Sequence, residues 1–371
     1  MFLREGFVPS SADPCLFIKG DLRVMLFVDD CLTTYPNTCD GETQYKCFVA
    51  LLQREYELQD DGMTDATAYL GMRIDWAPWL NGSRAWARVS CPGAIDSHVT
   101  LSDFDGCRDT KLPAVPKTNI QLGDCPSLGL DGKQERDEVA KFNFRARVGE
   151  LLWITRVSRP DISHAVNDLA RVAHNPGLAH VRALQHVSRY LATTPRMGLL
   201  YKKPTTLAES YPVGWTDANY APSYNTGVDS HKDNYRSTSA YIFTCNGTAV
   251  TWRSRRQQVL ATSSCDSETY AAAAAAKEAV HLRRLLAMPD EASPPVVLLG
   301  DNKSSIKAAE NGTDKDRSKH IDVSAHFLRE RCRDGSICFF YVPGTENVSD
   351  MLSKNLHTPS FNKFRAGMGV S

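Results

Sequence analysis

The sequence predicts a mixed α/β (α+β) chain with more than one domain, in which the last part is a mixed sheet flanked by helices. Three patterns predict this class. A hairpin pattern followed by a helical period lies near the start, a Pro-, Gly- and Asp-rich stretch lies between 102 and 140, and strand patterns alternate with helical ones after about 207. A length of 371 residues suggests two or three domains.

Composition narrows the class of protein. With 42% hydrophobic and 23% charged residues, the chain has the composition of a soluble globular protein. Its 43 basic and 43 acidic residues cancel, so any binding of nucleic acid must come from local patches. None of the 11 cysteines forms a CxxC pair, which argues against zinc knuckles and favours reduced thiols. We find no leader, and no apolar run reaches the roughly 18 residues that span a bilayer.

The first part carries a hairpin, a helix and a strand. Residues 16–35 predict a β-hairpin that turns at Gly20-Asp21, and Asp29-Asp30 directly follows its second arm. Residues 43–58 have apolar side chains at the helical period, and residues 69–76 resemble a strand.

The middle part is predicted to be a linker followed by helices. Residues 102–140 lack any apolar period, which predicts a long loop or linker. Helical periods return at 144–158 and 161–193, and Arg159-Pro160-Asp161 separates the two because proline is tolerated in a first helical turn. The histidines of this region, His164 among them, show no metal-ligand spacing and fit packing or surface positions.

The last part begins with strands and then alternates. The patterns predict three strands, then a helix, a strand, two helices, a strand and a final helix, at 211–216, 239–245, 248–252, 267–288, 296–299, 304–310, 322–333, 337–342 and 348–356. Strands that alternate with helices in this way predict a mixed sheet with helices packed on it.

Four acidic residues fall where such a sheet can bring them together. They end two strands or open two helices, namely Asp217, Glu268, Asp301 and Asp350. Each one alone also fits a capping or helix-dipole role. As a set they predict a cluster of carboxylates, whose oxygens select Mg²⁺ or Mn²⁺. Two such ions about 4 Å apart activate a water and stabilise the leaving oxygen of a phosphodiester.

Glu268 shares a helical stripe with small and apolar residues. Positions 268, 271, 275, 279, 282 and 286 are Glu, Ala, Ala, Ala, Leu and Leu. We therefore expect this acid on the face that packs against the sheet, opposite Lys277 and Arg284.

These segments resemble the ribonuclease H domain of Ty1/copia-type retrotransposon Pol polyproteins. The resemblance runs through GWTDANYA, the segment from YRSTSAYIF to SSCDSETYAA, and DNKSSI to MLSKNL, and covers about 207–358. Upstream, DPCLFIKG and MLFVDDCLTTY are similar to the palm hairpin of the same family's reverse transcriptase. VGELLWITRVSRPDISHAVNDLARVAHNP resembles its thumb and connection.

The resemblance implies a domain plan and an activity. It implies a partial reverse-transcriptase palm at 1–101, a linker at 102–140, a helical thumb or connection at 141–205 and a ribonuclease H-like domain at 206–371. We expect this last domain to cleave the RNA strand of RNA–DNA hybrids with two Mg²⁺ or Mn²⁺ ions held by the four acids. Asp29 and Asp30 correspond to the palm metal pair. The fingers and first palm Asp would precede residue 1, so we expect polymerase activity to be lost. A non-catalytic, nucleic-acid-binding transposon remnant is the alternative.

The remaining predictions concern substrate contacts and partners. Arginines and an aromatic residue before the Glu268 helix fit hybrid phosphates and sugars, or alternatively a solvated loop: Trp252, Arg253, Arg255 and Arg256. His320 fits proton shuttling or product release, or alternatively a structural role. The implied partners are an RNA–DNA hybrid, retrotransposon RNA or cDNA and other Pol-derived polypeptides, with no membrane. The implied location is cytoplasmic or nuclear, within a virus-like particle in an intact element, and DNA integration is the wider process.

Overall fold

The computed structural model describes residues 1–56, 66–80, 84–100, 110–222, 235–286, 294–311 and 319–371, without the side chains of 308, 311 and 319–322. Contacts group the chain into two units, 1–74 with 281–293 and 75–280 with 294–371. The segments predicted as linker and helical connection fall in the second unit, as does the predicted ribonuclease H-like domain apart from residues 281–293. The bounds of these segments stay a prediction.

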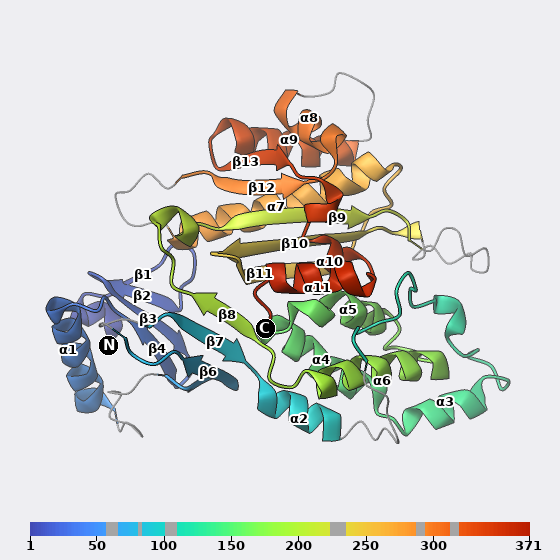
Figure 1. Cartoon of the computed structure of the whole chain (residues 1–371), viewed down its shortest axis with the longest axis horizontal. Helices are drawn as coiled ribbons and strands as arrows, with labels where there is room; N and C mark the ends of the chain where they lie inside the picture. Colours follow the sequence, from blue (N-terminus) through green and yellow to red (C-terminus); the bar gives the residue numbers. More distant parts are fainter. Residues whose placement is uncertain (57–65, 81–83, 101–109, 223–234, 287–293, 312–318) are drawn as a thin grey trace. The chain divides into compact units, whose positions relative to one another are not determined.

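The first unit contains an antiparallel sheet and a helix (Figure 1). Its strands pair in chain order, β1 (Val8–Pro9), β2 (Leu16–Lys19), β3 (Leu22–Phe27) and β4 (Asp30–Thr34). Helix α1 (Cys39–Glu55) starts earlier than predicted because the Thr38 hydroxyl caps it, accepting from the Gly41 N–H at 3.1 Å. Phe7, Leu22, Val24 and Phe48 form the core between them. The predicted hairpin and helix are confirmed.

A short hairpin follows helix α1. Strands β5 (Ala68–Tyr69) and β6 (Met72–Trp76) pair antiparallel around Leu70 and Gly71, which both have positive φ. The predicted strand at 69–76 is therefore two strands joined by a tight turn.

The second unit is built on a mixed sheet in the order β11-β10-β9-β12-β13. Strand β9 (Val213–Asn219) pairs antiparallel with β10 (Thr238–Cys245) and parallel with β12 (Val296–Gly300). Strands β11 (Thr248–Arg256) and β13 (Ile337–Tyr341) complete the edges. The predicted mixed sheet is confirmed, and β9 lies at its centre, where Gly214 makes room for the Phe243 ring.

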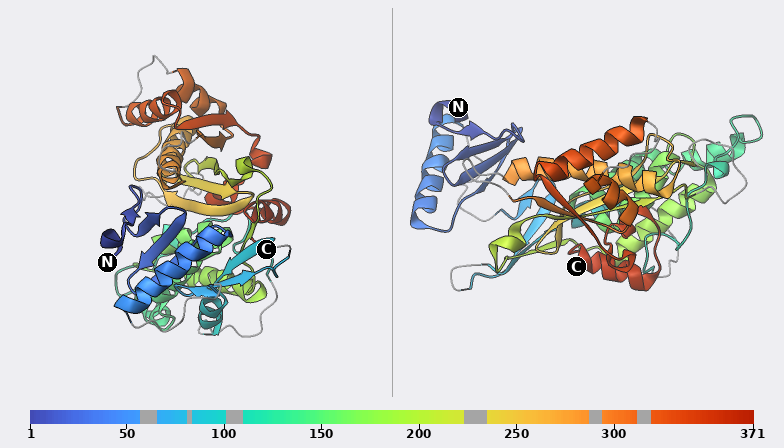
Figure 2. Two further views of the ribbon diagram at one scale, coloured as in Figure 1. Left: turned by 90° about the vertical axis from the view of Figure 1, so that its left-hand side faces the viewer. Right: turned by 90° about the horizontal axis from the view of Figure 1, so that it is seen from above.

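The two faces of this sheet carry different helices (Figures 1 and 2). On one face, Glu278 of α7 (Ser264–Leu286) accepts hydrogen bonds from Tyr241 at 3.1 Å and Thr251 at 2.9 Å. Alternate residues of the same strands face α4 (Phe144–Val157), where the Trp252 indole donates to the Thr155 carbonyl at 2.9 Å. Helices α8 (Lys303–Asn311) and α9 (Lys319–Arg333) connect β12 to β13.

The helical region and the sheet share one hydrophobic core. It contains buried side chains of α4, α5 (Ser163–Arg171), α6 (Leu178–Thr193), β10, α10 (Asp350–Ser353) and α11 (Thr358–Gly367). Helix α2 (Pro92–Thr100) adds Ile95, and β7 (Trp86–Ser90) pairs with β8 (Leu199–Lys202). This side of the sheet is therefore covered by the segment that the sequence predicted as connection.

Two predictions about the middle part are wrong. Helix α3 (Lys133–Ala140) lies inside the predicted 102–140 loop; it has good helix formers but buries only Val139, so it shows no apolar period. The predicted helix at 161–193 is two helices, α5 and α6, because α5 ends at Arg171 and Gly177 caps the start of α6. Residues 101–109 of the predicted loop lie outside the described residues.

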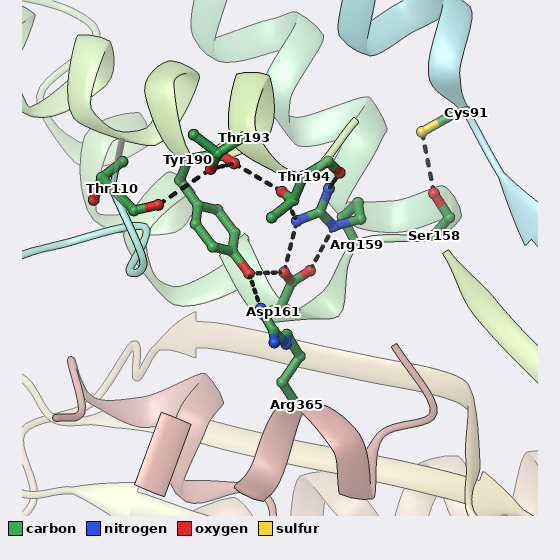
Figure 3. Close-up of polar contacts among 9 residues, drawn as sticks. All are labelled: Cys91, Thr110, Ser158, Arg159, Asp161, Tyr190, Thr193, Thr194 and Arg365. Carbon is green, nitrogen blue, oxygen red and sulfur yellow. Dashed lines mark hydrogen bonds and ion pairs between the residues drawn. The ribbon is translucent and has the colours of Figure 1, made fainter. Parts of the chain in front are cut away.

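A buried ion pair joins these helices to α11 (Figure 3). Arg159 donates from Nε and Nη2 to the Asp161 carboxylate at 2.9 and 2.8 Å, and Tyr190 donates to it at 2.7 Å. Arg365 on α11 donates to the Tyr190 hydroxyl at 3.2 Å. Burial opposes the charge on Asp161, but the Arg159 guanidinium outweighs it and lowers the Asp161 pKa. The Arg-Pro-Asp segment is therefore an anchor as well as a helix boundary.

Among the described residues, no helix combines the length and the apolar character that crossing a bilayer requires.

Candidate metal centre

Three of the four predicted acids meet at one edge of the mixed sheet. Asp217 lies on β9, Asp301 follows β12, and Asp350 opens α10. Because β9 and β12 are parallel neighbours, their carboxyl ends reach the same edge, where open α/β sheets place their sites. One carboxylate oxygen from each of the three aspartates lies within 4.8 Å of the others.

Glu268 approaches this cluster from α7. Its carboxylate accepts a hydrogen bond from the Ala218 N–H, next to Asp217. Ala271, Ala275 and Ala279 on its stripe are fully buried, as predicted, whereas the last member, Leu286, is 47% exposed. The alanines let α7 approach the sheet, so the acid reaches the centre from the face opposite α10.

The four carboxylates repel one another in a partly dry site. Burial, and then repulsion by Asp217 and Asp301, raises the pKa of Glu268 to about 9. Burial and Asp217 raise the pKa of Asp350 to about 7, and the same two causes raise the pKa of Asp301. The site therefore favours bound positive charge. Its donors are all carboxylate oxygens, which fits Mg²⁺ or Mn²⁺.

Lys354 supplies one positive charge to the cluster. Its Nζ lies 3.0 Å from Asp350 Oδ1 and 3.7 Å from Asp217 Oδ2. Lys354 was not predicted from the sequence, although the i,i+4 spacing of Asp350 and Lys354 on a helix was a usable signal.

Short polar side chains fix the segment that leads into α10. Asn347 donates to the Thr216 carbonyl at 3.0 Å and also hydrogen-bonds Asp301. The Ser349 hydroxyl donates to Asn347 Oδ1 at 2.6 Å, and the Ser353 hydroxyl donates to Asp217. Asn347, Ser349 and Ser353 are fully buried. They orient two of the aspartates, and none of the three was predicted because nothing in the local sequence marks them.

The residues predicted to contact nucleic acid do not share one face. The partly buried Trp252 is hydrogen-bonded to α4, and Arg253 approaches Tyr241 on the α7 face. Arg255 is exposed, whereas Arg256 is half-buried on the α4–α5 side. Their roles stay predictions, and the indole is already engaged within the fold.

Two of the other predicted site residues belong to the first unit, and one has a side chain outside the described residues. Asp29 and Asp30 are exposed at the β3–β4 turn, where Val28 has a positive φ of 53°. Within the described ranges, no third acid joins them in a metal-binding group. The His320 side chain lies outside the described residues. The His326 side chain on α9 is exposed, whereas its neighbours Ala325 and Leu328 are buried.

Comparison with known proteins identifies the family. The chain is 31% identical over 380 residues to the "Retrovirus-related Pol polyprotein from transposon RE1" of Arabidopsis thaliana, matching 100% of this chain and 23% of that protein. It is 27% identical over 375 residues to the corresponding polyprotein from transposon TNT 1-94 of Nicotiana tabacum, matching 99% of this chain and 26% of that protein. The chain belongs to the Ty1/copia-type retrotransposon Pol polyproteins. It spans about a quarter of the length of these relatives.

Other comparisons add less. No protein-family model matches the chain. Among solved structures, RNase H1 from Halobacterium salinarum NRC-1 is 14% identical with a TM-score of 0.28, covering 38% of this chain and 94% of that one. A foamy viral protease-reverse transcriptase in complex with an RNA/DNA hybrid is 15% identical with a TM-score of 0.29, covering 44% of this chain and 22% of that one. Because these TM-scores are low, the assignment of the mixed-sheet fold depends on the strand order β11-β10-β9-β12-β13 alone.

Proposed function

We propose that this Pol-type chain is a metal-dependent ribonuclease that hydrolyses the RNA strand of RNA–DNA hybrids. The observation that carries the proposal is the cluster of three aspartates within 4.8 Å, with Glu268 beside it. Structural acids are seldom packed this way, because their mutual repulsion costs stability unless a cation offsets it.

Four acidic residues would hold the metal ions, and two polar residues position two of these acids. Asp217, Asp301 and Asp350 supply carboxylate oxygens for Mg²⁺ or Mn²⁺, and Glu268 supplies a fourth. When bound, two such ions activate a water and stabilise the leaving oxygen of a phosphodiester. Asn347 and Ser353 hold Asp301 and Asp217 in place, so the ligand positions are set before any ion arrives.

Family membership supports the choice of substrate. The relatives are Pol polyproteins that match 99–100% of this chain. The motifs of its last part resemble the ribonuclease H domain of that family. Recognition of a hybrid would depend on its shape and 2′-hydroxyl groups rather than on base sequence.

One cleavage assay tests the proposal. The full chain is incubated with a hybrid that carries 5′-labelled RNA, in Mg²⁺, in Mn²⁺ and in EDTA, with Asp301→Asn as the matched control. We expect metal-dependent RNA fragments from the hybrid and none from single-stranded RNA or duplex RNA. Cleavage no greater than that of Asp301→Asn in both metals would contradict the proposal and leave binding without turnover.

A further inference from the structure

A polar cavity lies between α5 and the end of β11, outside the carboxylate cluster. Its volume is about 250 Å³, and its lining includes His164, Asn167, Arg171, Ser254 and Arg256. One wall is a helix of the connection region and the other is the nuclease sheet, so both parts of the second unit contribute to it.

Two buried polar groups face this cavity without a hydrogen-bond partner among the described residues. The His164 side chain is only 4% exposed, and neither of its ring nitrogens is hydrogen-bonded. Its nearest acid is Asp168, whose Oδ2 lies 3.8 Å from Nε2, beyond hydrogen-bond distance. The Ser254 hydroxyl is also buried and unpaired. Leaving such groups unsatisfied destabilises the folded chain, so a ligand that accepts from them would be favoured.

The charge of the lining selects an anion. Arg171 and Arg256 line the cavity, and Asp168, whose Oδ1 lies 3.4 Å from Arg171 Nη1, is the acid among its lining residues. The Arg255 side chain points to the opposite face of the sheet, because it is next to Ser254 on the same strand. Burial, followed by the nearby Arg256 and Arg171, keeps the pKa of His164 below its ordinary value despite Asp168, so the ring is a neutral N–H donor. Arginine, imidazole, hydroxyl and amide donors together match the oxygens of a phosphate.

The cavity and the carboxylate cluster lie on the same side of the sheet. Asp217 pairs with Ala240 and Ala240 pairs with Ser254, so these three residues form one cross-strand row whose side chains share a face. Two strand spacings separate the backbones of Asp217 and Ser254 by about 10 Å. His164 and Lys354 also line a common small space, which brings the cavity wall next to the cluster.

We propose that this cavity binds a backbone phosphate of the nucleic acid whose RNA strand is cleaved at the carboxylate cluster. The inference rests on the proposed function for its substrate, but binding can be measured without cleavage. A phosphate held about 10 Å from Asp217 would fix the register of the strand before hydrolysis.

The experiment measures hybrid affinity without divalent metal, in the full chain carrying Asp301→Asn. Arg256→Gln is expected to weaken hybrid binding about 5- to 10-fold and to reduce the slope of log K against log salt by about 1. Arg156→Gln is the matched control, because it removes an equal charge from an exposed site on α4. Equal effects of the two variants would overturn the proposal.

A second variant separates a phosphate contact from a structural role. Ser254→Ala removes a buried hydroxyl that has no partner among the described residues, so we expect the Tm of the variant to equal or exceed that of the wild type while hybrid binding weakens about 2- to 3-fold. Unchanged hybrid affinity in Ser254→Ala would overturn the proposal even if Arg256→Gln did not fold.

Inorganic phosphate distinguishes a free anion from a strand phosphate. It should raise the Tm of the wild type more than that of Ser254→Ala, and it should weaken hybrid binding by competition. A rise in Tm without any competition would assign the cavity to free anions and overturn the proposal.

Discussion

Replacing Asp161 with Asn would test the buried ion pair of Figure 3. The side chains of Arg159 and Asp161 are both 0% exposed, and the carboxylate accepts three hydrogen bonds of 2.7–2.9 Å. Asp161→Asn keeps the shape but leaves the Arg159 guanidinium buried without its counter-charge. Removing one partner of such a pair costs about 3–5 kcal/mol, against a total stability of about 5–15 kcal/mol for a typical protein.

The assay is urea unfolding of the full chain, followed by far-ultraviolet circular dichroism. We expect Asp161→Asn to lower the free energy of unfolding of the second unit by about 3–5 kcal/mol at pH 7. The double variant Arg159→Met with Asp161→Leu should lose less than the single one, because no charge stays buried. A loss below about 1 kcal/mol, or a double variant less stable than the single, would refute the reasoning.

The same pair makes a prediction about pH. The folded pKa of Asp161 is lowered, so the stability it adds is present above the ordinary aspartate pKa of about 3.9 and is lost as pH falls through the lower folded value. The stability difference between wild type and Asp161→Asn should therefore stay constant from about pH 7 to pH 5 and shrink only below about pH 4. A difference that shrinks between pH 7 and pH 5 would contradict this assignment.

Three further substitutions have expected outcomes. Lys354→Met removes the ammonium 3.0 Å from Asp350, which would compete with Mg²⁺ for the carboxylates. The metal-free Tm should therefore fall, while the rise in Tm on adding Mg²⁺ becomes larger. A smaller rise would contradict this competition between the ammonium and Mg²⁺. Glu268→Gln mimics the protonated acid that a pKa of about 9 implies. The metal-free Tm should therefore not fall, while Mg²⁺-dependent cleavage is lost. A clear drop in the metal-free Tm would argue against a protonated Glu268. Gly214→Ala places a methyl group against the Phe243 ring and should lower the free energy of unfolding in urea by about 1–3 kcal/mol. Gly93→Ala serves as its control, because the added methyl group meets no described neighbour within 4 Å.

Much of the fold followed from local periods in the sequence. The strands and helices around β9 were predicted because their apolar residues repeat at intervals that only one kind of element can bury. Helix α3 was missed because it buries almost nothing. The break between α5 and α6 was detectable, because 172–177 contains the turn signal Asn175-Pro176-Gly177, but the apolar period on either side outweighed it in the prediction. Local patterns predict elements only where those elements bury an apolar face.

The candidate site was predictable only in part, for a related reason. Asp217, Glu268, Asp301 and Asp350 stand at element ends, where sequence order alone suggests convergence. Asn347 and Ser353 act through partners more than 130 positions away, Thr216 and Asp217, so no spacing marks them. The cavity at His164 likewise depends on α5 meeting β11, which the sequence does not reveal.

The shared core of the helical region and the sheet has a consequence for how such chains change and exchange parts. Besides the link from Arg365 to Tyr190, the final residues pair with the start of β8, through Ser371 with Gly198 and Gly369 with Leu200. A recombination junction near residue 206 would separate the two halves of this core and expose both to water. Slowly exchanging backbone amides should therefore extend across that position, and recombination between related elements would have to transfer the two regions as one block.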